Sequence, residues 1–181
     1  MAAIQHALVL NDSSHWNHEL LGWISLYQHQ YEQAVAEMER AVALAPTEAE
    51  SYASLAEVLS DMGRTADVLA AAAQALRLKP EVADSHLASV GTAYAVVGRY
   101  EEARAPLLRS LSRYPNILPT HLILAVVYSE LGQTAEAQKE AAEVLRLNPN
   151  FSLVVHKQRM PIKDPAVLER HIAALRKAGL K

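Results

Sequence analysis

Two histidines near the start of the chain have a spacing that could hold a metal ion. His15 and His18 lie three residues apart and Glu19 follows directly; on a helix, residues three apart share one face. Imidazole and carboxylate groups are common zinc ligands, but a zinc site normally takes three or four of them from the protein. No third or fourth ligand is evident, and the other histidines show no common spacing. We therefore predict histidines on a surface or in a groove, and no metal site.

The sequence holds none of the common enzyme motifs. It has no glycine-rich phosphate loop, no nucleophile elbow and no dinucleotide fingerprint. It has no cysteine, which excludes disulfides and thiolate chemistry. The pair Glu101-Glu102 stands at the start of a predicted helix, where negative charge offsets the helix dipole. We therefore expect no catalytic residue and no cofactor.

Composition indicates what must position any functional residues. Of the 181 residues, 51% are hydrophobic but only 6% are aromatic, and alanine supplies much of the apolar count. Alanine, leucine, glutamate, arginine and glutamine favour helix because they lose little side-chain freedom there. We therefore predict an all-α protein.

Charge and hydropathy bear on partners and compartment. The net charge of −3 gives no reason to expect nucleic acid or a membrane surface as a partner. No apolar run reaches the roughly 18 residues that a membrane span needs, and residues 1–10 lack the features of a signal peptide. We expect a soluble cytoplasmic protein.

An internal repeat organises most of the chain. Four segments end alike at a proline, with spacings of 34, 35 and 34 residues, at Pro46, Pro80, Pro115 and Pro149. A turn glycine recurs in the second, third and fourth units, at Gly63, Gly98 and Gly132, and His29 takes its place in the first. Small or β-branched residues recur in register at Ala34, Val68, Ala103 and Ala137, and again at Ala41, Ala75, Ser110 and Val144. Small residues let two helices approach closely, glycine ends the first helix and proline follows the second.

The pattern resembles the tetratricopeptide repeat, a helix–turn–helix unit of about 34 residues. The residues that carry the resemblance read LLGWISLY…YEQAVAEMERAVALAP and VGTAYAVVGRYEEARAPLLRSLSRYP, and it extends over roughly residues 1–149. The resemblance implies a right-handed superhelical solenoid whose first helices line a concave ligand groove.

This register divides the chain into six segments. They are the second helix of a truncated preceding repeat at 1–14, four units at 15–48, 49–82, 83–117 and 118–149, and a C-terminal capping segment at 150–181. The helix pairs are expected at 15–28 with 31–44, 49–62 with 66–78, 83–97 with 100–113, and 118–131 with 135–147. Because the chain begins halfway through a repeat, we expect a fragment of a longer protein or a truncated gene product.

Two proline positions affect the expected helices. Pro106 lies inside the second helix of the third unit, where it removes a backbone hydrogen bond, and we interpret it as a tolerated bend or a hinge. Asp164-Pro165 is a strong helix start, a capping carboxylate followed by a proline suited to the first turn. We expect that last helix to stop at Gly179 and to cap the array.

The groove positions of the repeat family can be carried onto this chain, and they give a candidate partner-binding groove. It comprises Trp16, Glu19, Trp23 and Tyr27 in the first unit, Glu50, Ala53, Glu57 and Asp61 in the second, Leu87, Thr92 and Val96 in the third, and Leu122, Val126, Ser129 and Glu130 in the fourth. These positions lack the lysine, arginine and asparagine that hold a C-terminal carboxylate in chaperone-binding arrays. The groove has apolar and aromatic ends and an acidic middle.

We therefore predict a protein–protein interaction scaffold that binds an apolar or basic protein or peptide segment, with Trp16, Trp23 and Tyr27 as anchors. In an alternative interpretation, Trp16 and Trp23 pack against the missing upstream repeat. A third hypothesis is a self-assembling scaffold that dimerises through the open N-terminal half-repeat.

The C-terminal tail has a further resemblance. The segments RLNPNFSL and PIKDPAVLERHIAALRKAGL are similar to the end of bacterial multidomain proteins in which a class III adenylate cyclase domain precedes a tetratricopeptide array. That resemblance implies the regulatory C-terminal region of a cyclase signalling protein. The cyclase domain itself is absent from this sequence, so this chain is not expected to be an enzyme.

Overall fold

The described part of the protein is built from helices joined by short turns. The computed structural model describes residues 14–79 and 84–181. Within these ranges every regular element is a helix and no strand occurs, so the predicted all-α fold class is confirmed. No helix among the described residues is long and apolar enough to cross a membrane. The second helix predicted within 1–14 lies outside the described residues, except for Ser14.

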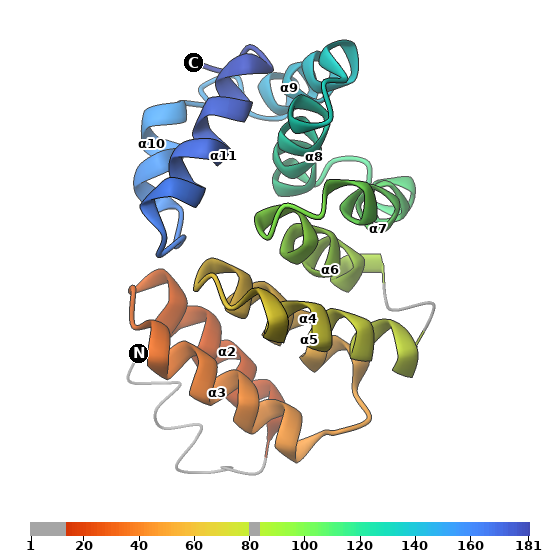
Figure 1. Ribbon diagram of the computed structural model, residues 1–181, viewed down its shortest axis with the longest axis vertical. Coiled ribbons are helices and arrows are strands. Elements are labelled where there is room, and N and C mark those ends of the chain that lie inside the picture. The colour runs from red at the N-terminus through yellow and green to blue at the C-terminus, as the bar shows by residue number, and fades with distance from the viewer. Residues whose placement is uncertain (1–13, 80–83) are drawn as a thin grey trace.

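The helices follow one another as hairpins (Figure 1). Their bounds agree with the predicted ones to within one residue in the four units. The hairpins are α2 (His15–Tyr27) with α3 (Tyr31–Leu44), α4 (Ala49–Asp61) with α5 (Thr65–Leu78), α6 (Asp84–Val96) with α7 (Tyr100–Arg113), α8 (Leu118–Glu130) with α9 (Thr134–Leu147), and α10 (Leu153–Arg159) with α11 (Pro165–Lys177). Pro106 lies inside α7, and the assigned helix runs through it from Tyr100 to Arg113.

The turns inside the first four of these hairpins share one backbone conformation. Each contains a residue with positive φ, namely His29 (58°), Gly63 (72°), Gly98 (82°) and Gly132 (74°). The amide of the next residue donates to a carbonyl five positions earlier; for example, Gln30 donates to Ser25 at 2.8 Å and Arg99 to Tyr94 at 2.8 Å. This is the bond that closes a helix C-terminus when the following residue is left-handed. His29 therefore performs the glycine role in the first unit.

Two large clusters of buried side chains form most of the core and meet at α6. The first extends from α2 to α6 and the second from α6 to α11, and Tyr94 of α6 packs against both. The recurring small residues occupy the seam within each hairpin; Ala34, Ala75 and Ala103 have no exposed surface. The first helices of successive units also pack on one another, α2 with α4, α4 with α6 and α6 with α8. They form the inner layer of a solenoid (Figure 1).

Glycine is required where the two helices of a hairpin approach most closely. A Cβ on Gly91 would lie 2.5 Å from Leu107 Cγ and 3.1 Å from the carbonyl oxygen of Ala103. A Cβ on Gly22, the corresponding position of the first unit, would lie 2.9 Å from both Cε and Cγ of Met38. Leu107 and Met38 are both fully buried, but the unbranched methionine side chain adapts more easily than the branched leucine.

The C-terminal pair α10–α11 caps the array as expected. The Asp164 carboxylate accepts a hydrogen bond from the Ala166 amide at 2.8 Å, and Pro165 opens α11. The helix packs on α8, where Ser129 Oγ donates to the carbonyl oxygen of Ala174 at 3.0 Å. The last repeat therefore has its apolar face covered.

The cap also reaches back to the beginning of the array. The Lys163 amide, in the turn between α10 and α11, donates to the Asp61 carbonyl oxygen at 2.8 Å. The Lys163 ammonium bonds Glu32 at 2.9 Å and lies 5.3 Å from the centroid of the Tyr31 ring. Residues about 100 or more positions apart thus meet, and the solenoid curls until its C-terminal turn contacts the first two hairpins (Figure 1).

Alanine at the two seam glycines should have unequal effects. Helix propensity favours Gly→Ala by up to about 1 kcal/mol, and overpacking of a buried seam costs about 1–3 kcal/mol. We expect Gly91→Ala to lower the free energy of unfolding by about 1–2 kcal/mol, and Gly22→Ala to change it by less than about 1 kcal/mol. Urea unfolding followed by circular dichroism measures both. Equal effects would contradict the packing described at Leu107.

Candidate binding groove on the inner face

A groove opens on the inner face of the solenoid. It encloses a cavity of about 250 Å³. The walls come from the first helices of all four repeat-like hairpins and from the C-terminal segment, and the lining residues are Trp23, Leu26, Tyr27, Glu57, Asp61, Thr92, Val96, Leu118, Pro119, Leu122, Ile123, His156, Arg159, Met160 and Pro161. Apolar side chains predominate, as is typical of ligand sites.

Seven of the fifteen residues predicted from the sequence line this cavity. They lie on α2, α4, α6 and α8, and are Trp23, Tyr27, Glu57, Asp61, Thr92, Val96 and Leu122. Trp23 is half-buried, and Tyr27 is largely exposed at the groove. The structure therefore brings one aromatic face of α2 opposite the apolar residues of α8.

Five predicted residues of the second to fourth units lie elsewhere. Ala53, Leu87 and Val126 are buried in packing between helices. Ser129 is buried by its bond to α11, because the cap covers the end of the groove where it was expected. Glu130 is exposed and accepts a hydrogen bond from the Tyr100 hydroxyl.

The remaining three lie at the edges of the first two units. Trp16 is 59% exposed, and its ring lies 4.8 Å from that of His15; the residues of the proposed upstream repeat lie outside the described part. Glu19 is buried and accepts a hydrogen bond from Ser51. Glu50 forms an ion pair with Lys79 at 3.1 Å.

The C-terminal segment forms a wall of the groove that the repeat pattern did not predict. His156, Arg159, Met160 and Pro161 line the cavity from α10 and the turn that follows it. They carry no repeat signature, and their position depends on how far the solenoid curls. Leu26 and Ile123, by contrast, are each adjacent in sequence to a predicted groove residue, Tyr27 and Leu122. Including the neighbours of the predicted positions would therefore have identified them.

The acidic middle of the groove is electrostatically unusual. Burial raises the pKa of Glu57, and a hydrogen bond with Ser89 partly opposes this shift. Burial, and then the charge of Glu57, hold the pKa of Asp61 well above its usual value. Partial burial, and then the two carboxylates, raise the pKa of Tyr27. These three groups therefore lie close enough to influence one another.

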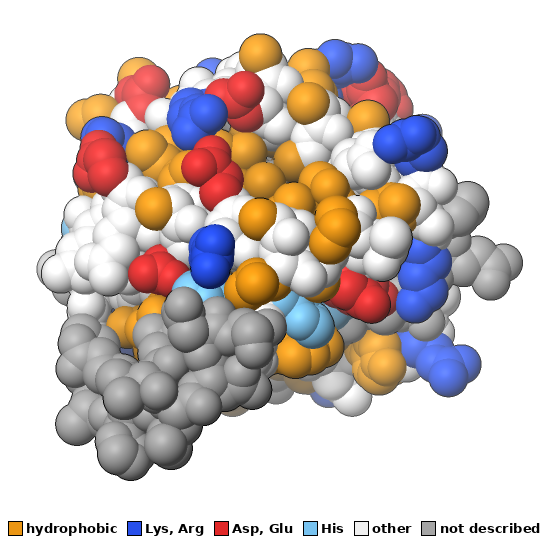
Figure 2. Space-filling view, turned by 90° about the horizontal axis from the view of Figure 1, so that it is seen from below, with side chains coloured by type: hydrophobic (Ala, Val, Ile, Leu, Met, Phe, Trp, Pro, Cys, Tyr) orange, Lys and Arg blue, Asp and Glu red, His pale blue; other side chains and the backbone are white. Residues whose placement is uncertain are grey.

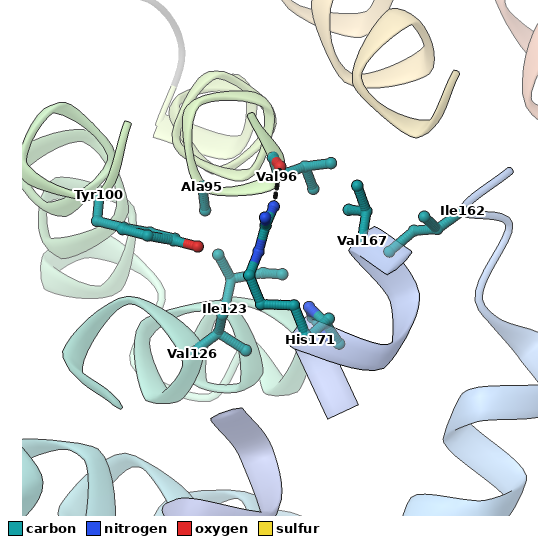
Figure 3. A pocket seen from close by; sticks show the side chains of 9 residues that line it. Ala95, Val96, Tyr100, Ile123, Val126, Ile162, Val167 and His171 are labelled. Atoms are coloured by element: carbon teal, nitrogen blue, oxygen red, sulfur yellow. Dashed lines mark hydrogen bonds between the residues drawn. The ribbon is translucent and has the colours of Figure 1, made fainter. Parts of the chain in front are cut away.

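A second cavity, between α6, α8 and α11, is too small for a ligand. Its volume is about 10 Å³, about the space of one water molecule. Ile123 and Val126 face Ile162 and Val167 across it, and the Arg170 guanidinium reaches the Val96 carbonyl oxygen at 3.4 Å (Figure 3). It is a packing seam between the cap and the array.

A comparison with protein families identifies the repeats. The family model described as Tetratricopeptide repeat matches residues 18–48 and 118–151, which correspond to the first and fourth units. Those two segments are therefore similar to the tetratricopeptide repeat. A search of curated proteins found no match.

Several solved structures have a similar shape. PilW, a type IV pilus biogenesis factor, has a TM-score of 0.69 at 20% identity, over 98% of this chain and 80% of that chain. PilF of Pseudomonas aeruginosa has a TM-score of 0.65 at 22% identity, over 94% and 78%. YrrB, described as a TPR protein with an unusual peptide-binding site, has a TM-score of 0.57 at 16% identity, over 97% and 95%. At these identities the likeness shows the fold alone.

The two tetratricopeptide units that match the family model share a histidine–glutamate pair. His18 Nδ1 lies 2.7 Å from Glu37, and His121 Nδ1 lies 2.6 Å from Glu140. Both histidines are buried, and each links the first helix of its unit to the second. The separation of 19 residues between histidine and glutamate recurs in both units, a pairing that the sequence-based prediction did not include. Within the described residues no group of three or more possible metal ligands occurs.

Another histidine pair stands where the cap meets the groove. His156 Nε2 lies 3.3 Å from His171 Nε2, so one neutral ring donates to the other. Burial, and then the neighbouring His156, lower the pKa of His171 to about 3. Burial also lowers the pKa of His156. Both imidazoles are therefore neutral at neutral pH.

This pair predicts acid sensitivity of the cap. Because the pKa of His171 is about 3 in the folded state and about 6.5 when unfolded, the unfolded chain binds the proton first. The stability from neutral His171 is complete above pH about 6.5 and is lost as the pH falls toward 3, by at most about 1.4 kcal/mol per unit. Between pH 7 and 5, wild type should lose about 1–2 kcal/mol more than His171→Gln in urea unfolding. The exposed control His29→Asn should keep the wild-type profile; identical profiles of wild type and His171→Gln would refute the prediction.

Proposed function

We propose that the protein is a non-catalytic interaction scaffold whose inner groove binds a segment of another polypeptide. The observation that supports this most directly is the open groove of about 250 Å³. It is lined by one face of every inner helix and by the cap. A site assembled from successive repeats is extended along the array, so it suits an extended or helical peptide better than a compact metabolite.

The aromatic residues of α2 support an apolar anchor. Trp23 and Tyr27 line the groove together with Leu26 and Ile123. Tryptophan and tyrosine carry a large share of binding energy at protein interfaces. YrrB, similar in fold, is described as having a peptide-binding site; in this chain we place the corresponding activity in the groove beside α2.

The charges of the groove favour an apolar or basic partner. The inner repeat helices contribute the carboxylates Glu57 and Asp61, while Arg159 comes only from the cap. On the face in Figure 2, acidic and basic side chains are interspersed among apolar ones. Such a mixed surface gives no extended basic field for a phosphate backbone, and we propose neither nucleic acid nor a membrane as the partner.

The other sequence-based hypotheses remain predictions. The family model and these structures give no support to the resemblance of the tail to cyclase-type proteins. Dimerisation through the N-terminal half-repeat concerns residues 1–14, which lie almost entirely outside the described ranges. The cytoplasmic location also remains a prediction.

Selection of binding peptides tests the proposal. A random 12-residue phage library panned on the full chain should yield peptides with aromatic or aliphatic residues next to lysine or arginine. Removal of one interface hot spot costs 2 kcal/mol or more, so we expect Trp23→Ala with Tyr27→Ala to weaken their binding at least thirtyfold in calorimetry. Trp16→Ala is the matched control, since Trp16 lies on the same helix but outside the cavity. Recovered peptides that bind the double variant as tightly as wild type would exclude this groove.

A further inference from the structure

Two carboxylates stand side by side in the apolar groove. Glu57 and Asp61 are four residues apart on α4, so they share one helix face, and both line the cavity. Tyr27 reaches the same place from α2, since both carboxylates act on its hydroxyl. Around them lie apolar side chains, including Leu26 and Val96. The groove therefore places two carboxyl groups in a region of low polarity.

The Asp61 carboxylate has no partner among the described residues. Asp61 is only 7% exposed, and its backbone carbonyl accepts the Lys163 amide. The Lys163 ammonium bonds Glu32 instead. No described residue gives the Asp61 side chain a hydrogen bond or an ion pair, and Glu57 receives only the bond with Ser89.

Other glutamates of the inner layer and its seams are satisfied. Glu19 is bonded by Ser51, Glu50 by Lys79, Glu37 by His18 and Glu140 by His121. Buried charges in proteins are normally paired, because an unpaired charge loses its hydration without compensation. An unpaired buried carboxylate that faces a cavity thus calls for a ligand.

The chemistry of the site selects the kind of cation. Calcium takes six to eight oxygen ligands and magnesium a full octahedron, whereas two carboxylates and one phenol are too few without many waters. Aromatic faces beside an anion suit an organic cation, which gains from ring contact as well as from charge. Trp23 and Tyr27 supply those faces.

We propose that Glu57 and Asp61 form a subsite for one organic cation of the primary ammonium or guanidinium class, with its alkyl stem against Trp23 and Tyr27. On a polypeptide partner this is the side chain of a lysine or arginine. The subsite rests on the proposed function only for the source of this cation, because a free alkylammonium ion would occupy it as well.

Protons take part in this binding. With both carboxylates held toward the protonated form, an arriving cation favours their ionised form and releases a proton. The other titratable or charged groups that face the groove are Tyr27 from α2 and His156 and Arg159 from α10, with Tyr31 and Lys163 near Asp61. Arg159 adds one positive charge and so limits the site to a single cation, while His156 is neutral at neutral pH.

Titration with n-butylammonium chloride tests the subsite on the full chain. We expect saturable changes of amide resonances in α2 and α4 by NMR, with n-butanol binding at least tenfold more weakly at equal ionic strength. The carboxyl carbon resonance of Asp61 should titrate at lower pH when butylammonium is present. Asp61→Asn and Glu57→Gln should each weaken butylammonium binding at least tenfold. Glu50→Gln, on the same helix but paired with Lys79, should bind as wild type does.

Several results would overturn the subsite. They are changes that stay linear to high concentration, equal binding of butylammonium and butanol, or full binding by Glu57→Gln and Asp61→Asn. If one variant fails to fold, the other variant and the butanol comparison in wild type still decide. If butylammonium does not bind but peptides do, the subsite is rejected and the peptide groove is not. If butylammonium binds but no peptide ligand is found, the proposed function is rejected and the subsite is not.

Discussion

Close approach of two helices at small residues is the contact on which the whole structure depends. Leu107 fills the space left by Gly91, Met38 fills that left by Gly22, and Ala103 is fully buried in the same seam as Gly91. Because each hairpin is closed in the same way by a left-handed turn residue, successive hairpins have nearly the same shape. Units of equal shape stack with a constant small rotation, and this rotation produces the concave inner face.

The cap gives that face a boundary. Through the bonds of Lys163 to Asp61, Glu32 and Tyr31, the turn between α10 and α11 lies against the first two hairpins. These contacts are partly exposed and contribute little stability singly. Their consequence is geometric, since they bring Met160 and the neighbouring residues to the side of the groove that an open solenoid leaves empty.

The carboxylates of α4 show how the groove departs from a simple core. A structure selected for stability alone would place apolar residues at Glu57 and Asp61, because their burial without a cationic partner is unfavourable. The wall that α8 contributes to the same groove has the apolar residues Leu122 and Ile123. The acidic pair is therefore better explained by a ligand than by packing.

The amino-acid sequence alone determined the local structure of this protein. The period and the turn residues gave the helices of the four units to within a residue, and Asp164-Pro165 gave the start of α11, because hairpin packing and capping depend on residues close in the chain. The resemblance to the tetratricopeptide repeat also placed Trp23, Tyr27, Glu57 and Asp61 on the inner face. Only the tertiary structure decided that Trp16 lies beyond the cavity, that α11 covers Ser129 and that Arg159 and Met160 close the groove. These positions depend on the sum of many small rotations between repeats, and that sum cannot be predicted from any single residue or spacing.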